Sequence, residues 1–260
     1  MDEEEDKQQE APNPLGLGKS QSMVHPPNTV KTYGKRLYSP LGLRPKQTKK
    51  EGKPYVIGIC GGPSSGKSSV AKFIKTKLPH AVILNLIHFY KPIRGNLRRR
   101  SRANSIIEDQ DKGEEEIKLD IRDAYRNNDF DSPDAIDWAL MNKGVKALVA
   151  GQPFNKPIYD DETMIRTART EHVKPSSVVI IEGHLIFCNE ELMKMMDLKV
   201  FIDTDDDVRL SRRVLKMSRK HPNDSTFLND ILQKYENYVK PSFEKFIEPT
   251  KKYADIILPN

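Results

Sequence analysis

Eight consecutive residues of the sequence could hold the phosphate groups of a nucleotide. They read Gly61-Gly62-Pro63-Ser64-Ser65-Gly66-Lys67-Ser68, which is the spacing G-x-x-x-x-G-K-S. Glycines let the backbone curl so that successive N–H groups point inward at an anion. The Lys67 ammonium would reach the β- and γ-phosphates, and the Ser68 hydroxyl would ligate Mg²⁺. The spacing therefore predicts a phosphate-binding loop for ATP, with GTP as an alternative, that extends to Ser69.

The segments on either side of this loop support the same interpretation. The apolar run Tyr55–Cys60 precedes the loop, and residues 69–74 (S-V-A-K-F-I) follow it with a helical pattern. A phosphate-binding loop lies between a strand and a helix, and the helix adds the positive end of its dipole. The alternative is an ordinary Gly- and Ser-rich turn, but the Lys and Ser in register favour the phosphate loop.

Composition narrows the class of protein. Only 37% of the 260 residues are hydrophobic and 31% are charged, so part of the chain is expected to lie outside the core. No apolar run approaches the ~20 residues that span a bilayer, and the acidic residues 2–6 do not resemble a signal peptide. Cys60 and Cys188 fall in or beside apolar runs and predict reduced thiols. We therefore expect a cytoplasmic protein without membrane contact.

The charge of the chain bears on its ligands. A net charge of +6 suits anionic phosphates, and no motif combines aromatic and basic residues as nucleic-acid-binding modules do. The expected ligands are therefore a nucleotide and a small molecule, and nucleic acid is not an expected partner.

Residues 1–52 have the composition of a tail. After the acidic start, neither Asp nor Glu occurs between Ala11 and Lys50, whereas Lys, Arg, Pro, Gly and Ser are frequent. Such a segment cannot bury enough apolar surface to offset the entropy of ordering it. We expect a disordered basic tail, and the functional alternative is an arm that docks a protein partner.

From Pro54 onward, strand and helix patterns alternate. The predicted strands are Tyr55–Cys60, Ala81–Leu84, Val178–Ile181, Lys199–Ile202 and Asp255–Leu258. The predicted helices are Ser68–Lys77, Pro133–Ala150, Asp206–Lys220 and Asp224–Tyr238. Short, continuously apolar strands are typical of a parallel sheet that is buried on both faces. The alternation predicts a doubly wound α/β domain over residues 53–260, with helices on both faces of a mainly parallel sheet.

A charged insertion at about residues 94–122 interrupts this domain. A basic block at residues 98–102 is followed by acidic residues between Glu108 and Glu116, which is typical of a mobile surface segment. Ser101 and Ser105 lie near arginines and are candidate phosphorylation sites, although serines beside arginines are common.

Glu182 and a group of arginines could complete a phosphate site. Glu182 ends a buried strand, so it would lie near the metal if that strand ends beside the loop; an ordinary acidic turn is the alternative. Helical spacing puts Arg209, Arg212 and Arg213 on neighbouring faces of one turn. Guanidinium groups suit migrating phosphoryl groups, but a solvated basic helix face has the same pattern. The expected catalytic residues are Lys67, Arg212 and Arg213.

The chemistry of three other residues leaves more than one role possible for each. Asp131 and Asp134 bracket Pro133, and they could serve only as acidic caps at a helix start. Tyr159 could stack on a base or could belong to the core.

Together these segments resemble the uridine kinase (uridine–cytidine kinase) family over roughly residues 54–260. Beyond the loop, the resemblance rests on residues 89–91 (F-Y-K), 130–135 (F-D-S-P-D-A), 157–160 (P-I-Y-D), 181–183 (I-E-G), 203–213, 238–243 (Y-V-K-P-S-F) and 249–255 (P-T-K-K-Y-A-D). It implies a P-loop kinase fold. It also implies transfer of the ATP γ-phosphate to the 5′-hydroxyl of a pyrimidine ribonucleoside, a reaction of pyrimidine salvage.

The resemblance also implies roles for individual residues. It would place Asp131 on the ribose hydroxyls, Tyr90 and Tyr159 around the nucleoside, and Arg209 near the ribose. Arg212 and Arg213 would lie near the phosphates. Because the family tends to oligomerise, it further implies a homo-oligomer.

The sequence departs from the family pattern where the family carries its proton-accepting Asp. That position is Ile87, and an isoleucine can neither accept a proton nor bind a metal. Positions that contact the base in the family are Asp161, Met164 and Asp230 here.

Three hypotheses follow from these departures. The first is a nucleoside kinase in which His88 or an acid of the insertion acts as base, although alternation along an extended segment would turn His88 away. The second is a non-catalytic nucleotide-binding subunit or scaffold. The third is a kinase for another hydroxylated acceptor.

Overall fold

The structure is a computed structural model of the 260-residue chain, and it describes residues 52–92, 126–160, 165–220 and 227–260. All but the last residue of the predicted tail (residues 1–52) lies outside the described residues. The whole predicted insertion at about residues 94–122, with Ser101 and Ser105, also lies outside them, as do the departures Asp161 and Met164.

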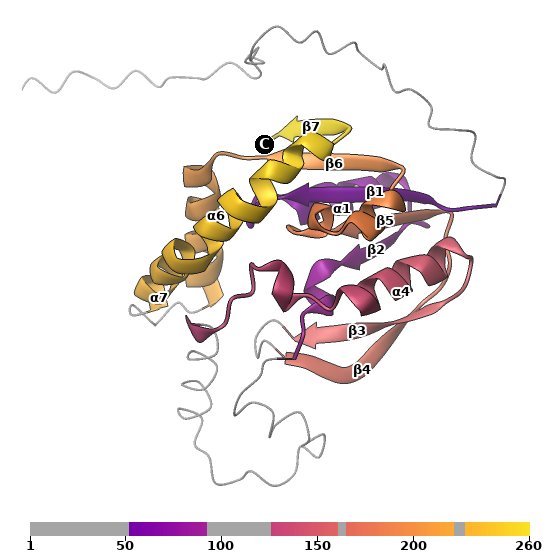
Figure 1. Ribbon diagram of the computed structural model, residues 1–260, viewed down its shortest axis with the longest axis horizontal. Helices are drawn as coiled ribbons and strands as arrows, with labels where there is room; N and C mark the ends of the chain where they lie inside the picture. The colour runs from indigo at the N-terminus through magenta and orange to yellow at the C-terminus, as the bar shows by residue number, and fades with distance from the viewer. Residues whose placement is uncertain (1–51, 93–125, 161–164, 221–226) are drawn as a thin grey trace, which may run out of the picture. The chain divides into compact units, whose positions relative to one another are not determined.

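A five-stranded parallel sheet forms the centre of the described domain (Figure 1). Its strands, in spatial order, are β2 (Val82–Asn85), β5 (Val178–Glu182), β1 (Tyr55–Gly61), β6 (Leu198–Asp203) and β7 (Ile256–Pro259). Every neighbouring pair is parallel. Each predicted strand agrees with an observed one to within one residue at either end, so these predictions are confirmed.

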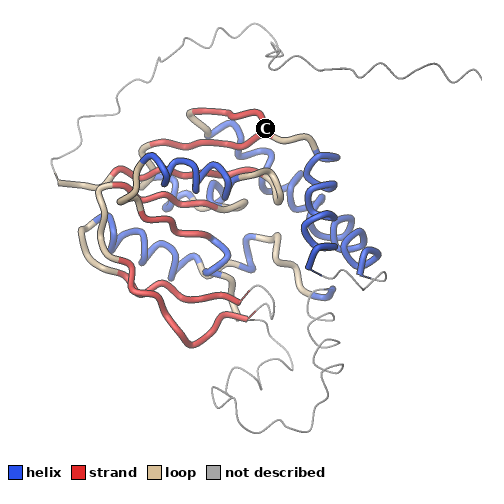
Figure 2. The backbone as a smooth tube through the Cα atoms, turned by 180° about the vertical axis from the view of Figure 1, so that it is seen from behind, coloured by secondary structure: helices blue, strands red, loops and turns tan. Residues whose placement is uncertain are grey.

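Alternate side chains of β1 pack on opposite faces of the sheet. Ile57 and Ile59 belong to a core that includes residues of α1 (Lys67–Lys77). Val56 and Cys60 belong to a larger core on the other face, which includes residues of α4 (Trp138–Val149). This is the arrangement expected of a parallel sheet covered on both faces (Figures 1 and 2). The predicted doubly wound α/β fold is therefore confirmed.

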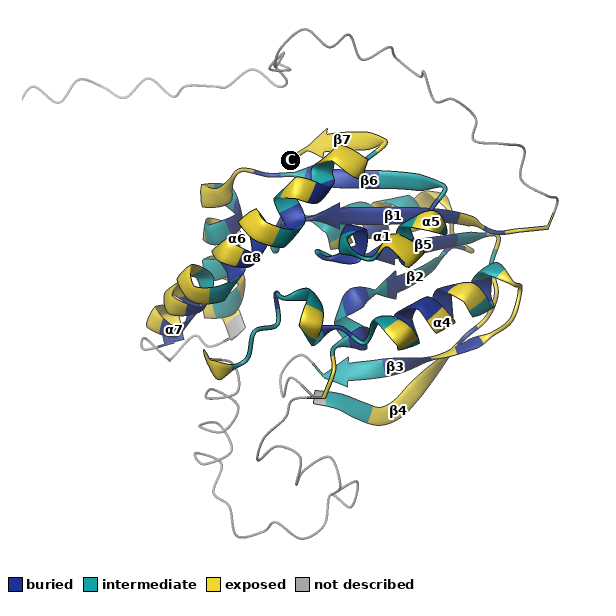
Figure 3. Cartoon of the chain, in the orientation of Figure 1, coloured by how far each residue is buried: buried dark blue, intermediate teal, exposed yellow. Residues whose placement is uncertain are grey.

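The C-terminal part of the chain is almost continuously helical. After α6 (Asp206–Lys220), the helix type between Phe227 and Tyr253 alternates twice between α and π and ends as 3₁₀. The segments are α7 (Phe227–Lys234), η4 (Tyr235–Val239), α8 (Lys240–Ser242), η5 (Phe243–Ile247) and η6 (Glu248–Tyr253). Two short helices, η3 (Ile186–Cys188) and α5 (Glu190–Lys194), follow β5. Figure 3 shows that the central strands are buried and that edge strand β7 is exposed.

The predicted helix Pro133–Ala150 is interrupted. It consists of the 3₁₀ turn η2 (Pro133–Ala135) and of α4, which begins at Trp138. Ile136 lies between them in extended conformation and forms an isolated antiparallel bridge with Tyr90. This bridge, together with complete burial of the Ile136 side chain, favours the break, and it ties the segment after β2 to the loop that carries Asp131.

A β-hairpin that the sequence analysis did not predict packs beside α4. Its strands are β3 (Phe154–Asp160) and β4 (Ile165–Val173), which pair antiparallel. Pro157 lies inside β3, where the register shifts between Pro157 and Tyr159. The hairpin is attached to the 3₁₀ turn η1 (Leu86–Phe89), because the backbone N–H of Tyr159 donates to His88 Nδ1 at 3.3 Å.

This attachment gives a pH-dependent contribution to stability. Burial, followed by the nearby charge of Lys156, lowers the pKa of His88 from 6.5 to about 4. The unfolded chain therefore binds a proton between these pH values that the folded chain does not, so stability falls as pH drops from 6.5 to 4. His88→Asn keeps an acceptor for Tyr159 N–H and removes the titration.

Wild type should lose more free energy of unfolding than this variant when the pH drops from 6.5 to 4. We expect the difference to be about 1–2 kcal/mol, which is less than the full pKa shift implies because the ring is only half-buried. Chemical denaturation at several pH values measures the difference. Parallel pH profiles for the two proteins would contradict the assignment.

Candidate functional site

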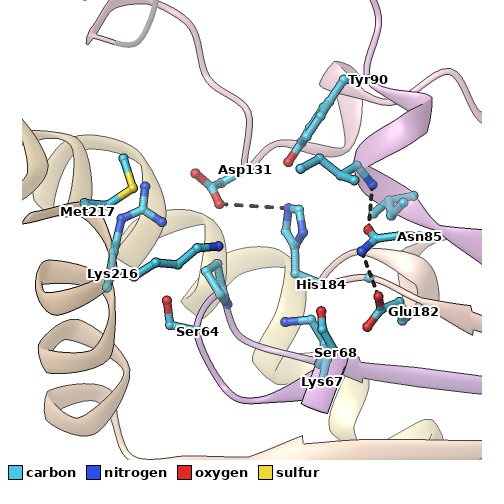
Figure 4. A pocket seen from close by; sticks show the side chains of 15 residues that line it. Ser64, Lys67, Ser68, Asn85, Tyr90, Asp131, Glu182, His184, Lys216 and Met217 are labelled. Carbon is cyan, nitrogen blue, oxygen red and sulfur yellow. Dashed lines mark hydrogen bonds and ion pairs between the residues drawn. The ribbon is translucent and has the colours of Figure 1, made fainter. Parts of the chain in front are cut away.

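The carboxyl ends of β1, β2 and β5 surround one cavity of about 310 Å³ (Figure 4). This is the edge at which open α/β sheets bind their ligands. The lining residues come from five places in the chain. They are Pro63, Ser64, Lys67 and Ser68 of the loop, Asn85–Ile87 and Tyr90 at and after the end of β2, Asp131, Glu182–His184 at and after the end of β5, and Arg213, Lys216 and Met217 of α6.

The phosphate loop is held in its curled conformation by one hydrogen bond within it and by two from residues outside it. Ser65 N–H donates to the Gly62 carbonyl at 3.1 Å. The Ser65 carbonyl accepts from Thr204 Oγ1 at 3.2 Å and from Asn260 Nδ2 at 2.7 Å. In a trans peptide the next N–H points opposite to the carbonyl, so these bonds turn the N–H of Gly66 toward the other side of the loop. Gly66 itself has φ 94°, a left-handed conformation that glycine adopts without strain.

The loop end of the cavity is positively charged. Lys67 Nζ donates to the Gly62 carbonyl at 2.7 Å. Burial, with repulsion from Arg209, lowers the pKa of Lys67 to about 8, although attraction to Cys60 and Glu182 opposes this. The first turn of α1 contains no acidic residue, so its helix dipole is not neutralised locally. A polyphosphate is the ligand that this end of the cavity suits.

Glu182 fits the role of a magnesium ligand. Its Oε1 accepts from Asn85 Nδ2 at 2.7 Å, while its buried Oε2 has no hydrogen-bond partner among the described residues. A carboxylate oxygen with unused lone pairs suits a hard cation, and Mg²⁺ keeps waters and phosphate oxygens as its other ligands. Ser68 lines the same cavity, so Ser68 and Glu182 would hold the ion. The described residues contain no group of three or more His, Cys, Asp or Glu that could form a metal site without a nucleotide.

Asp131 and Tyr90 lie on the opposite side of the cavity from the loop (Figure 4). The N–H of Asp131 donates to Asp129 Oδ1 at 2.9 Å, which fixes the turn that presents the carboxylate. Burial raises the pKa of Tyr90 well above its usual value, so the phenol stays neutral and can donate. Tyr159 packs on Tyr90, with ring centroids 5.4 Å apart, but does not itself line the cavity.

The three arginines of α6 occupy different places. Arg213 lines the cavity. Arg212 is exposed and lies beside the loop, since a Cβ at Gly66 would be 3.9 Å from its Nη1. Arg209 is only 2% exposed and lies behind the loop, where its guanidinium carbon is 3.7 Å from the centroid of the Phe243 ring. Its Nε donates to the Thr204 carbonyl at 3.2 Å. Arg209 therefore supports the loop and does not line the cavity.

Gly62 explains why the loop can approach Arg209 so closely. A Cβ at this position would lie 2.5 Å from Arg209 Nη1. The residues Gly61, Gly62, Ser65, Gly66 and Ser69 shape the loop but are not cavity-lining residues.

His184 lines the cavity and was not singled out from the sequence. Its Nε2 lies 3.9 Å from Asp131 Oδ1 (Figure 4), and this buried nitrogen has no hydrogen-bond partner among the described residues. Burial lowers the pKa of His184 to about 4 despite the attraction of Asp131, so the imidazole is neutral at pH 7. The signal in the sequence was a histidine two residues beyond a strand that ends beside the loop.

Two positions at which the sequence departs from the family pattern, Ile87 and Asp230, lie in different environments. Ile87 lines the cavity, whereas His88 does not. Asp230 is buried and pairs with Arg126 at 2.6 Å, so its carboxylate is engaged outside the cavity.

Comparison with known proteins places the chain in a family. The model of the phosphoribulokinase / uridine kinase family matches residues 56–260. The chain belongs to this family. A uridine kinase of Lactiplantibacillus plantarum is 37% identical over 210 residues, which cover 81% of this chain and 88% of the relative. A uridine kinase of Streptococcus equi subsp. zooepidemicus is 36% identical over 207 residues, which cover 80% and 88%.

Solved structures agree on the fold. D-glycerate 3-kinase from Cryptococcus neoformans is 15% identical with a TM-score of 0.52, and the match covers 78% of this chain and 83% of that one. Phosphoribulokinase from Rhodobacter spheroides is 16% identical with a TM-score of 0.50, covering 80% and 70%. The chain thus has the P-loop kinase fold, and its family membership makes it a nucleotide-binding phosphotransferase. Over the described ranges, no helix is long and apolar enough to cross a membrane.

Gly66 offers a test of the loop with a matched control. Gly66→Ala would force a side chain into φ 94° and bring its Cβ to 2.5 Å from Asn260 Nδ2. Gly151→Ala imposes similar strain at φ 73° with open space around the Cβ. We expect each variant to lose about 1–2 kcal/mol of stability, and only Gly66→Ala to weaken nucleotide binding, by about 10-fold or more. Thermal melting and titration calorimetry with Mg-ATP measure the two effects. Unchanged affinity in Gly66→Ala would contradict the role given to the loop.

Proposed function

We propose that the protein transfers the γ-phosphate of ATP to the 5′-hydroxyl of uridine or cytidine, a reaction of pyrimidine salvage. The observation that supports this proposal is that one cavity has two chemically different ends. The phosphate loop, Ser68 and Glu182 form one end, and Tyr90 and Asp131 form the other. Relatives that are 36–37% identical and named uridine kinase support the class of acceptor.

At the donor end, the chain supplies positioning and positive charge. The loop would hold the β- and γ-phosphates, with Lys67 beside them. Mg²⁺ held by Ser68 and Glu182 would neutralise charge on these oxygens. Arg213 and Lys216 on α6 line the facing wall and would stabilise the migrating phosphoryl group. GTP carries the same phosphates, so this end of the cavity favours neither base.

At the acceptor end, Asp131 would accept hydrogen bonds from the ribose hydroxyls and Tyr90 would contact the nucleoside, with Tyr159 behind it. The bond from O5′ to phosphorus forms as the bond to the β–γ bridging oxygen breaks, and ADP takes that electron pair. The hydroxyl proton must also leave, and without a protein base it would pass to an oxygen of the transferred phosphoryl group. Because Ile87 is apolar and lines the cavity, it cannot receive this proton, which favours a second candidate: a nucleotide-binding subunit without catalysis.

A direct assay separates the two candidates. Purified protein with Mg-ATP is incubated with uridine, cytidine, other nucleosides and small hydroxylated acceptors, and ADP and phosphorylated product are quantified. We expect uridine or cytidine 5′-monophosphate, and Lys67→Ala should lower the rate by at least about 100-fold. ATP binding without product above the Lys67→Ala background would contradict the kinase proposal and support the second candidate.

Ile87 can be tested by restoring a carboxylate. Ile87→Asp places a proton acceptor in the cavity, so we expect kcat to rise about 10- to 100-fold. Ile87→Asn is the matched control, since it has the same size as Asp but is a much weaker base, and it should give no such gain. Steady-state kinetics with the preferred nucleoside measure both. Equal rates for the Asp variant and wild type would mean that the reacting hydroxyl does not lie beside residue 87.

A further inference from the structure

The ends of β2 and β5 bring Ile87 and His184 to the same edge of the sheet. Asn85 and Glu182 are register partners in the two strands, and Ile87 and His184 each lie two residues further along. Both line the cavity. One of these equivalent positions thus carries an apolar side chain, and the other carries an imidazole.

The end of β2 offers no free side-chain acceptor to a bound hydroxyl. The Asn85 side chain accepts from Ile87 N–H at 2.9 Å and donates to Glu182 at 2.7 Å. The Ile87 side chain itself has no polar atom. A hydroxyl that enters between the two strand ends must therefore find its hydrogen-bond acceptor on β5 or on the loop that carries Asp131.

His184 has an acceptor atom in this place. Its Nε2 is buried, lies 3.9 Å from Asp131 Oδ1, and has no partner in the described ranges. The ring also forms a hydrogen bond with the backbone of Phe130, which leaves Nε2 as the nitrogen that bears the lone pair when Nδ1 carries the proton. Buried polar atoms are rarely left unsatisfied, so this one is typical of a site that a ligand completes.

We propose that His184 Nε2 accepts a hydrogen bond from the acceptor hydroxyl and, beside Asp131, orients it toward the phosphate. Donating its hydrogen to Nε2 leaves the hydroxyl oxygen with lone pairs that can face the γ-phosphorus at the loop end of the cavity. This contact compensates in binding for the absence of a polar group at Ile87. The inference rests on the proposed function, because it assumes that the reacting hydroxyl enters this cavity.

The contact can be isolated by removing the hydroxyl and the imidazole separately. Uridine and 5′-deoxyuridine are titrated into wild type and His184→Leu in the presence of Mg²⁺ and a non-hydrolysable ATP analogue. We expect wild type to bind uridine about 10-fold more tightly than 5′-deoxyuridine. In His184→Leu this ratio should fall close to 1. An equal ratio in both proteins would overturn the proposal.

Two further variants separate the contact from a structural role. His184→Gln can place its amide oxygen near the position of Nε2 and should restore part of the preference for uridine over 5′-deoxyuridine. His184→Asn carries its oxygen near the position of Nδ1 and should lose this preference as the Leu variant does. The Asn variant therefore keeps the test valid if the Leu variant unfolds at a low temperature. His80→Leu, at an exposed histidine that does not line this cavity, should bind both ligands as wild type does.

Turnover distinguishes this proposal from the proposed function. If wild type discriminates the two nucleosides, His184→Leu does not, and no uridine 5′-monophosphate forms, the proposed function fails and the His184 contact stands. We expect His184→Leu to lower kcat/KM for uridine roughly 10- to 100-fold. If wild type phosphorylates uridine and His184→Leu keeps the wild-type kcat/KM, the contact fails and the function stands. Wild type that binds neither nucleoside would overturn both.

Discussion

The register of three neighbouring parallel strands determines where the chemistry of this protein can take place. Glu182 of β5 lies opposite Ile59 of β1 and opposite Asn85 of β2. Two residues after Ile59 the phosphate loop begins at Gly61. This register sets the carboxylate beside the loop and beside the amide that holds one of its oxygens. A slip by one residue would turn Glu182 to the other face of the sheet.

The loop depends in turn on parts of the chain that are distant in sequence. Thr204, after β6, and Asn260, after β7, both hold the carbonyl of Ser65. Arg209 packs behind Gly62 and is covered by the ring of Phe243. Residues after β6 and β7, together with the C-terminal helices, thus fix the conformation of the loop, although none of them is expected to touch the phosphates through these contacts. Preorganisation of this kind lets electrostatic stabilisation act without rearrangement during the reaction.

The sequence predicted the features that local pattern determines. The five strands were short apolar runs, and the phosphate loop followed from its spacing and flanks. The hairpin β3–β4 was missed because Pro157 interrupts β3, and because β4 is rich in charged and small residues without a clear apolar alternation. The break at Ile136 depends on its bridge to Tyr90, and the position of Arg209 depends on Phe243. Such tertiary contacts leave no periodic pattern in the sequence.

His184 shows why a site can be read only in part from a motif. The departure at Ile87 is visible in the sequence. Its consequence depends on which residue occupies the register-equivalent position after the neighbouring strand. Parallel strands that end in register offer equivalent positions to a ligand, so a polar group absent from one strand end can be supplied by the next. In this cavity the imidazole lies beside the carboxylate of Asp131, at 3.9 Å, which comes from a separate loop. If the nucleoside binds as proposed, β5 and that loop would supply the polar contacts to its reacting hydroxyl, and the apolar side chain of Ile87 after β2 would form one wall of the cavity.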